Sequence, residues 1–174
     1  MKYNKVLLFG STGAGKSTTA EKLSVLKGCP LLHVDLVRFN DDFSMNSNER
    51  IINTVFDFIN NPSWVLDYTP VNENDLFLRE LVDESDLTLH FSFSIEDSIK
   101  GYYKKYAEMK SGIPPKGLPN CRNAFSEDTL RMLIDANARR IREWPDLKRK
   151  LGPLNSKIKI ISSYADIDRF IEQF

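Results

Sequence analysis

The chain has 174 residues, of which 41% are hydrophobic and 28% are charged, and its formal net charge is zero. This length and composition suit one ordinary globular domain whose core needs no metal or disulfide. No apolar run approaches the roughly 20 residues of a membrane span, and the first residues lack the apolar stretch of a signal peptide. Cys29 and Cys121 lie far apart without metal-binding spacing. We therefore expect a cytoplasmic protein without a membrane segment, disulfide or zinc site.

Short apolar runs alternate with amphipathic stretches along the whole chain. The pattern predicts strands at residues 6–9, 31–35, 64–67, 87–93 and 157–161. Between and after them it predicts helices at 15–27, 47–60, 73–82, 94–110, 126–143 and from 163 onward. Strands that alternate with helices predict an α/β fold of three layers, with a parallel sheet covered on both faces.

Residues 100–150 depart from simple alternation. Two helical patterns and a loop with two glycines and three prolines at 111–119 stand where one crossover helix would suffice. This predicts a single domain over 1–174 with an inserted helical lid at about 100–150. The insertion is rich in lysine and arginine, whereas residues 35–99 are mainly acidic. The distribution suits a polyphosphate ligand and argues against a long nucleic-acid footprint, although solvated helix faces account for many of these charges.

The segment Gly-Ser-Thr-Gly-Ala-Gly-Lys-Ser at 10–17 matches the phosphate-binding motif GxxxxGK[ST] in full. It follows a predicted strand and opens a predicted helix, which is the context that the motif requires. Glycines allow backbone amides to surround phosphate oxygens, and the helix N-terminus adds positive field. We therefore predict ATP binding by Gly10, Ser11, Thr12, Gly13, Ala14, Gly15, Lys16, Ser17 and Thr18. The alternative, a tight glycine turn without a ligand, fits this signature less well.

Asp35 and Asp67 each end an apolar run, which places both carboxylates at the edge of the sheet where ligands bind in α/β folds. One such aspartate can hold Mg²⁺, together with the hydroxyl of Ser17, and the other can accept a proton from an attacking hydroxyl. A helix cap or a turn is the alternative for either one. His33 and His90 lie within apolar runs and are interpreted as packing residues.

The phosphate-binding motif, the run His33-Val-Asp35, the run Trp64-Val-Leu-Asp67 and the basic insertion together resemble small adenylate-kinase-like P-loop kinases, in particular the DNA topology modulation proteins. The resemblance spans nearly the whole chain, and its most specific motif is the P-loop. It implies a five-stranded sheet of order 2-3-1-4-5, a mobile lid, and transfer of the γ-phosphoryl group of ATP to a small acceptor with Mg²⁺.

The resemblance also implies roles for particular residues. Asp35-Leu-Val-Arg38 is similar to the Asp-x-x-Arg segment that holds the acceptor in nucleoside-monophosphate kinases, and Arg79 is a further acceptor-binding candidate. Asp67-Tyr-Thr-Pro70 departs from the pattern, because the usual glycine and arginine are missing. A nucleoside monophosphate and a less charged hydroxyl compound therefore both stay open as acceptors.

Basic side chains of the insertion are candidates to close over the phosphates, with Arg139 taken as the catalytic one. The set comprises Arg122, Arg131, Arg139, Arg140 and Arg142. Asp135 is spaced to pair with Arg131 and Arg139 on a helix surface, which explains part of the pattern. Tyr102, Tyr103 and Tyr106 either stack on a base or, the interpretation favoured here, form a helix face that packs on the sheet.

Three functions fit these features. A small-molecule kinase would use Lys16 and Mg²⁺ on the phosphates and Asp35 or Asp67 on the acceptor. A nucleotide-binding regulatory protein or slow NTPase would need no acceptor pocket around Asp35 and Arg38. A kinase of nucleic-acid ends would need a basic path to Asp35, which residues 35–99 do not provide.

Overall fold

The structure is a computed structural model that describes residues 3–70, 76–118 and 126–174, and the side chains at 76, 129, 133, 140 and 141 are not described. Five parallel strands form one sheet in the order β2-β3-β1-β4-β5, as the resemblance implies. The strands are β1 (Lys5–Gly10), β2 (Leu31–His33), β3 (Trp64–Tyr68), β4 (Leu87–Phe91) and β5 (Ile158–Ile161).

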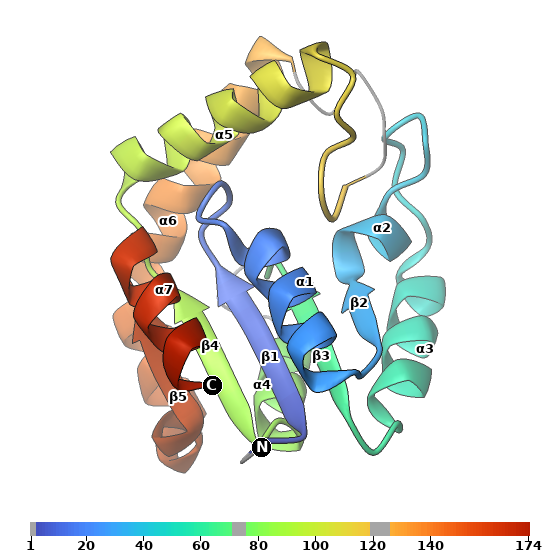
Figure 1. Ribbon diagram of the computed structural model, residues 1–174, viewed down its shortest axis with the longest axis vertical. Coiled ribbons are helices and arrows are strands. Elements are labelled where there is room, and N and C mark those ends of the chain that lie inside the picture. The colour runs from blue at the N-terminus through green and yellow to red at the C-terminus, as the bar shows by residue number, and fades with distance from the viewer. Residues whose placement is uncertain (1–2, 71–75, 119–125) are drawn as a thin grey trace.

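Helices connect the strands and cover both faces of the sheet. They are α1 (Lys16–Lys27), α2 (Val34–Arg38), α3 (Asn48–Ile59), α4 (Leu76–Glu84), α5 (Ile95–Lys110), α6 (Glu127–Leu151) and α7 (Tyr164–Gln173), with a 3₁₀ helix η2 at Gly152–Lys157. Figure 1 shows the sheet with α5 crossing above its upper edge. No helix in the described part of the chain is long and apolar enough to span a bilayer.

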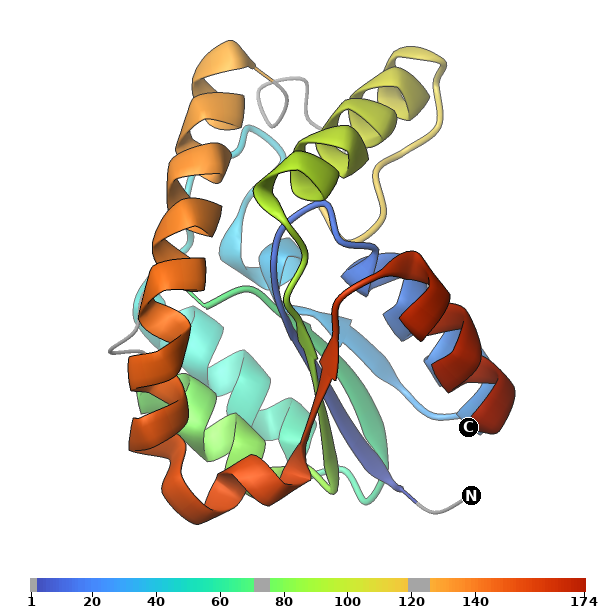
Figure 2. The ribbon, with the colours of Figure 1, turned by 90° about the vertical axis from the view of Figure 1, so that its left-hand side faces the viewer.

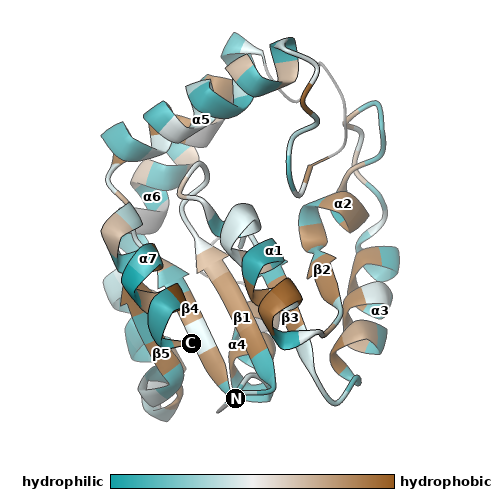
Figure 3. Cartoon of the chain, viewed as in Figure 1, coloured by the Kyte–Doolittle hydropathy of each residue, from teal (hydrophilic) through white to brown (hydrophobic). Residues whose placement is uncertain are grey.

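Two hydrophobic cores hold the three layers together. Helices α1 and α7 pack on one face of the sheet, where Leu23 and Phe170 meet Val6 and Leu89. Helices α3, α4 and the end of α6 pack on the other face, and Figure 2 shows these layers on either side of the sheet. The strands are mostly hydrophobic, as expected for a sheet buried on both faces, whereas α5 is largely hydrophilic (Figure 3). The cores fix the upper edge of the sheet, where the P-loop lies.

The second predicted strand is shorter than the pattern suggested. Strand β2 ends at His33, and Asp35 lies in the first turn of the short helix α2 instead of at a strand end. Asp35 pairs with Arg38 one turn later, and an acidic residue in a first turn is favoured by the helix dipole. The prediction that Asp35 emerges at the ligand-binding edge of the sheet nevertheless places it correctly near the P-loop.

Helix α6 is longer than predicted, because it continues past Pro145 to Leu151 instead of ending at 143. Trp144, Leu147 and Leu151 pack into the core that includes Leu7 and Phe9, and Leu151 is fully buried. This burial outweighs the backbone hydrogen bond that proline removes. The upper half of α6 therefore belongs to the predicted lid, whereas its lower half covers the sheet.

Candidate active site

The P-loop joins β1 to α1 and has the backbone geometry of a phosphate cradle. Gly13 and Gly15 have φ angles of 80° and 83°, in the left-handed region that glycine adopts without strain. Helix α1 begins at Lys16, so its first amides open toward the loop. The ammonium group of Lys16 donates to the carbonyl oxygens of Gly10 at 3.1 Å and Ser11 at 2.8 Å, which holds it across the mouth of the cradle.

Neighbouring elements hold the P-loop in place. The Ser11 amide donates to the carbonyl oxygen of Phe91 at 2.8 Å, and the Thr12 amide donates to Oδ1 of Asn137 at 3.2 Å. The amides of Ser11 and Thr12, which the sequence predicted to bind ATP, are therefore already hydrogen-bonded within the protein. Asn137 is 3% exposed and lies on α6, so the same residue fixes both the loop and a lid helix.

Helix α5 rests directly on the P-loop through two glycines. A Cβ at Gly101 would lie 1.9 Å from the carbonyl oxygen of Gly13, and a Cβ at Gly13 would lie 2.3 Å from that of Ser98. No side chain can stand at either position without a shift of backbone. The base of the lid is thus packed onto the phosphate cradle.

One end of the cradle carries the polar groups predicted to hold Mg²⁺. Asp67 is 7% exposed, and its Oδ2 lies 2.9 Å from Nδ1 of His33 on the adjacent strand. Burial acts to raise the pKa of Asp67, but the hydrogen bond from His33, the charge of Lys16 and the hydrogen bond from Ser17 together hold that pKa below its usual value. An ionised carboxylate beside a hydroxyl fits the oxygen ligands that Mg²⁺ prefers.

The other end of the site is formed by Asp35 and Arg38. Nη1 of Arg38 donates to Oδ1 of Asp35 at 2.8 Å, and the Arg38 guanidinium stands 5.6 Å from the centre of the Tyr68 ring. Burial raises the pKa of Asp35, and the neighbouring Arg38 opposes that rise. A carboxylate with a raised pKa next to a phosphate cradle is suited to receive a proton.

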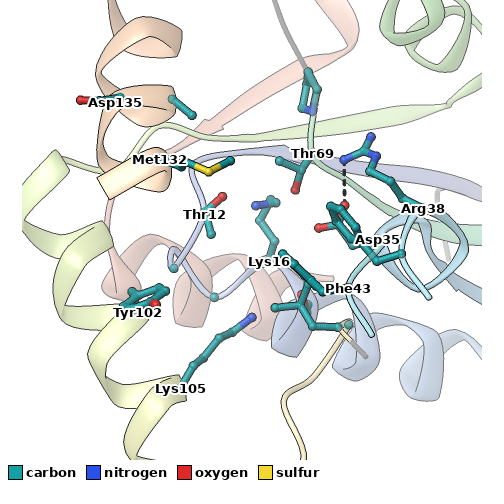
Figure 4. A pocket seen from close by; sticks show the side chains of 18 of the residues that line it. Thr12, Lys16, Asp35, Arg38, Phe43, Thr69, Tyr102, Lys105, Met132 and Asp135 are labelled. Carbon is teal, nitrogen blue, oxygen red and sulfur yellow. Dashed lines mark hydrogen bonds and ion pairs between the residues drawn. The ribbon is translucent and has the colours of Figure 1, made fainter. Parts of the chain in front are cut away.

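Ser17 at the first end and Asp35 and Arg38 at the second line one cavity of about 430 Å³, whereas Asp67 lies behind Ser17 and is not among the lining residues. Lys16, Ser17, Asp35 and Arg38 line it together with side chains of the lid, among them Arg139, and Figure 4 shows Lys16 between the P-loop and Asp35. Its volume is within the range of small-ligand sites. A second cavity of about 260 Å³ adjoins the other side of the P-loop, where Gly15, Thr18, Lys22 and Tyr164 contribute to its wall.

The loop at 111–118 reaches down from the lid onto the site, as the gold segment in Figure 1 shows. Gly117 lies so close that a Cβ there would be 2.7 Å from Oγ of Ser17 and 2.9 Å from Nδ1 of His33. Lys116 forms an ion pair with Glu21 of α1 beside it. The loop therefore covers the Mg²⁺ end of the cradle.

Comparisons with solved structures match this architecture. A shikimate kinase from Acinetobacter baumannii, described in complex with shikimate, superposes with a TM-score of 0.62 at 15% identity, covering 98% of this chain and 89% of that one. A shikimate kinase from Bacteroides thetaiotaomicron superposes with a TM-score of 0.54 at 12% identity, covering 98% and 95%. The chain has the P-loop kinase fold. No family model matches the sequence, and no curated protein matches it.

Within the P-loop kinase fold, the predicted site residues do not all come together. Arg139 lines the larger cavity, whereas Arg79 of α4 donates to the carbonyl oxygen of Lys150 at 2.7 Å and is not among the cavity residues. The structure therefore does not bring Arg79 to the acceptor site. Arg131 and Arg142 are exposed and do not line either cavity, Arg122 is outside the described residues, and so is the side chain of Arg140.

Sequence reasoning missed several residues of the site. His33 contacts Asp67 instead of only packing, and its place at the end of an apolar run, two residues before Asp35, was the available signal. Asn137 and Phe43 had no signal, because their roles depend on tertiary contacts and on a loop backbone. Tyr102 packs as expected, but against the lid cluster with Phe43 and Leu118 instead of the sheet.

Proposed function

We propose that the protein is an ATP-dependent small-molecule kinase that transfers the γ-phosphoryl group to a hydroxyl of a small acceptor. The observation that carries the proposal is a single cavity with Lys16 and Ser17 of the P-loop at one end and the carboxylate of Asp35 at the other. A nucleotide-binding protein without an acceptor has no need of a carboxylate in this place.

The residues fit Mg-ATP. The amides from Gly13 to Thr18 and the Lys16 ammonium would hold the β- and γ-phosphates, while the Ser17 hydroxyl and the Asp67 carboxylate would hold Mg²⁺. When bound, Mg²⁺ neutralises phosphate charge and orients the phosphates. The smaller cavity beside Thr18 and Tyr164 is placed to receive the nucleoside.

In the proposed reaction the acceptor's hydroxyl oxygen forms a bond to the γ-phosphorus. The bond between that phosphorus and its bridging oxygen breaks, and ADP leaves with the electron pair. The hydroxyl proton passes to Asp35, which returns it to water after the product leaves. Lys16 and Arg139 are placed to balance charge on the transferred group, and the loop bearing Gly117 would exclude water from it.

We also propose that, among proteins of this fold, the chain is related to the DNA topology modulation proteins. The proposal is supported by the sequence likeness in the P-loop and in the runs His33-Val-Asp35 and Trp64-Val-Leu-Asp67. The acidic surroundings of Asp35 favour a small acceptor over DNA.

A screen of ATP consumption against nucleosides, nucleoside monophosphates, sugars and small acids tests the kinase proposal. We expect at least one class to stimulate ADP formation, with stimulation lost in Asp35→Asn while Mg-ATP binding is retained. Equal, slow turnover across the whole panel, unchanged in Asp35→Asn, would instead support the regulatory or slow-NTPase alternative.

A further inference from the structure

The larger cavity is lined by apolar side chains as well as by charged ones. The apolar lining includes Phe39, Phe43, Met45, Pro70, Leu118 and Met132. Met45 is 61% exposed and Met132 is 70% exposed, although both border a cavity beside charged groups. Large apolar side chains at the mouth of a polar site are suited to contact an apolar part of a ligand.

Phe43 holds an unusual backbone conformation in this wall. Its φ angle is 67°, a region that bulky residues rarely enter. A tight turn enforces it, because the Phe43 amide donates to the carbonyl oxygen of Asn40 at 2.9 Å and the Asn40 amide donates to that of Ser44 at 2.9 Å. Such a conformation costs about 1–2 kcal/mol, and strain of this kind gathers at functional sites.

The strained turn places two aromatic rings face to face. The rings of Phe39 and Phe43 have centroids 4.3 Å apart and an interplanar angle of 16°, and both side chains line the cavity. Phe43 also packs with Tyr102 and Leu118 of the lid. The wall of the cavity is thus built from flat apolar groups, which complement a flat ring in a ligand.

The charges near this wall disfavour an anionic acceptor. Arg38 is 8% exposed and bound to Asp35 at 2.8 Å, so an anionic group placed on Arg38 would lie beside the Asp35 carboxylate. Asp67, at the end predicted to hold Mg²⁺, acts to raise the pKa of Asp35, whereas Lys16 and Lys105 act to lower it. The acceptor end itself therefore carries one basic and one acidic side chain, which are already paired with each other.

The other basic residues of the cavity are Lys16, Lys105 and Arg139. Lys16 belongs to the P-loop and donates to its carbonyl oxygens, and its charge also opposes the rise in the pKa of Asp35. Lys105 lies one turn after Gly101, which contacts Gly13, and borders both cavities. The triphosphate would engage these three cations.

We propose that the acceptor is an uncharged alcohol attached to a flat apolar ring, with its hydroxyl at Asp35 and its ring against Phe39 and Phe43. The inference rests on the proposed kinase function and narrows its substrate class. The hydroxyl oxygen bonds to the γ-phosphorus, the proton passes to Asp35, and ADP leaves. Thr69, which lines the cavity beside Asp35, offers a neutral hydrogen-bonding group for the rest of the acceptor.

Matched pairs of acceptors test the charge requirement. One pair is a benzylic alcohol and the same compound with a ring carboxylate, and another is 2-phenylethanol and its ring carboxylate, so that only the charge differs within a pair, while glycerol serves as the alcohol without a ring. ADP formation is measured for each with Mg-ATP. We expect kcat/KM to be at least about tenfold higher for the uncharged, ring-bearing member of a pair.

Variants at position 43 test the role of the ring. Phe43→Gly removes the ring and relieves the backbone, so the turn is retained, and Phe43→Leu keeps an apolar side chain that is not flat. We expect KM for the ring-bearing alcohol to rise about tenfold in Phe43→Gly, with less change in Phe43→Leu. Phe56→Ala on α3, outside the cavity, is the matched control and should leave KM unchanged.

The outcomes separate the two proposals. A higher kcat/KM for the charged member of each pair, or unchanged KM in Phe43→Gly, would overturn the uncharged-ring inference and leave the kinase function standing. Bound Mg-ATP without stimulation by any compound would overturn both.

Discussion

At the scale of single residues, His90 is a buried titratable group whose pKa is strongly lowered in the folded protein. Its ring stacks on Phe9, with centroids 4.6 Å apart, and makes a tilted contact with Trp144 at 3.7 Å, and His90 is 7% exposed. Burial and the nearby charge of Lys16 lower the pKa of His90 from 6.5 to about 3. His90 is therefore a neutral packing residue in the folded protein, as its place in an apolar run predicted.

This shift predicts acid sensitivity. Between pH 6.5 and pH 3 the unfolded chain binds a proton at position 90 that the folded protein does not, so His90 lowers the free energy of unfolding as pH falls. The contribution is about 2 kcal/mol between pH 8 and pH 5. Urea unfolding measures the free energy of unfolding across this range. As pH falls from 8 to 5, this free energy should decrease less in His90→Phe, which keeps an aromatic ring at this position, than in the wild type. Parallel pH profiles for the two proteins would contradict the assignment.

His33 gives a second prediction at this scale. Its contact with Asp67 orients a carboxylate placed to hold Mg²⁺, and loss of such a partner typically weakens metal binding by about 10–100-fold. In His33→Leu the half-saturating Mg²⁺ concentration for ATP turnover should rise at least about tenfold. His33→Asn retains a polar group, so its half-saturating Mg²⁺ concentration should lie between those of the wild type and His33→Leu. An unchanged Mg²⁺ titration in His33→Leu would show that the histidine only packs.

At the scale of elements, the loop at 111–118 is the part of the predicted lid that reaches Ser17 and His33. Gly117 and Gly112 both have positive φ angles, of 69° and 83°, so alanine pays a similar backbone cost at either position. They differ in surroundings, because a Cβ at Gly117 meets Ser17 and His33, whereas one at Gly112 has no atom within 4 Å. Alanine variants at Gly117 and Gly112 therefore distinguish the effect of backbone strain from the effect of the contact between the loop and the site.

We expect Gly117→Ala to lower kcat/KM for acceptor-stimulated turnover by about 10–100-fold, because the loop must withdraw from Ser17. Gly112→Ala should stay within about twofold, while both variants lose a similar amount of stability, about 1 kcal/mol. Steady-state kinetics and urea unfolding of the two variants provide the measurement. Equal kinetic loss in both would mean that strain, and not closure, governs the loop.

Elements also show what the sequence could predict. The positions of the buried strands were predicted from apolar runs, and the P-loop motif predicted the junction of β1 and α1. The end of β2 was misplaced by two residues, since the pairing of Asp35 with Arg38 within one helical turn has no apolar signature. Helix α6 was cut short because Pro145 is a local stop signal, while the burial of Leu151 that overrides it is a tertiary effect.

The residues of the candidate site also divide into those that the sequence could predict and those that it could not. The motif residues Lys16 and Ser17 line the cavity where the P-loop pattern places them, and Asp67 lies in β3 beside them, because local pattern fixes the position of each. Arg79 was grouped with the acceptor by charge alone, and the fold turns it toward the end of α6. Phe43 was missed because a positive φ in a turn of Asn, Asp and Phe is set by hydrogen bonds that the sequence does not display.

At the scale of the whole molecule, the P-loop is the point at which sheet and lid meet. Phe91 of β4 binds the Ser11 amide, Asn137 of α6 binds the Thr12 amide, and α5 rests on Gly13. A ligand bound in the phosphate cradle would therefore also stabilise the contacts of the P-loop with α5, α6 and β4. A ligand that fills it should stabilise the fold as a whole instead of a single loop.

This coupling predicts a thermal shift that depends on Lys16. A ligand at about 100 times its dissociation constant adds about 2.7 kcal/mol to the stability of the state that binds it, so Mg-ATP should raise the melting temperature of the wild type by several degrees. Lys16→Ala should lose most of this shift, because it removes the cation held across the cradle. The readout is the difference in melting temperature with and without ligand, so a change in the stability of the unliganded variant does not affect it.

Lys110→Ala, at the far end of α5 and outside both cavities, is the control and should keep the full shift. An undiminished shift in Lys16→Ala would mean that the nucleotide binds elsewhere, and the kinase proposal would fall with it.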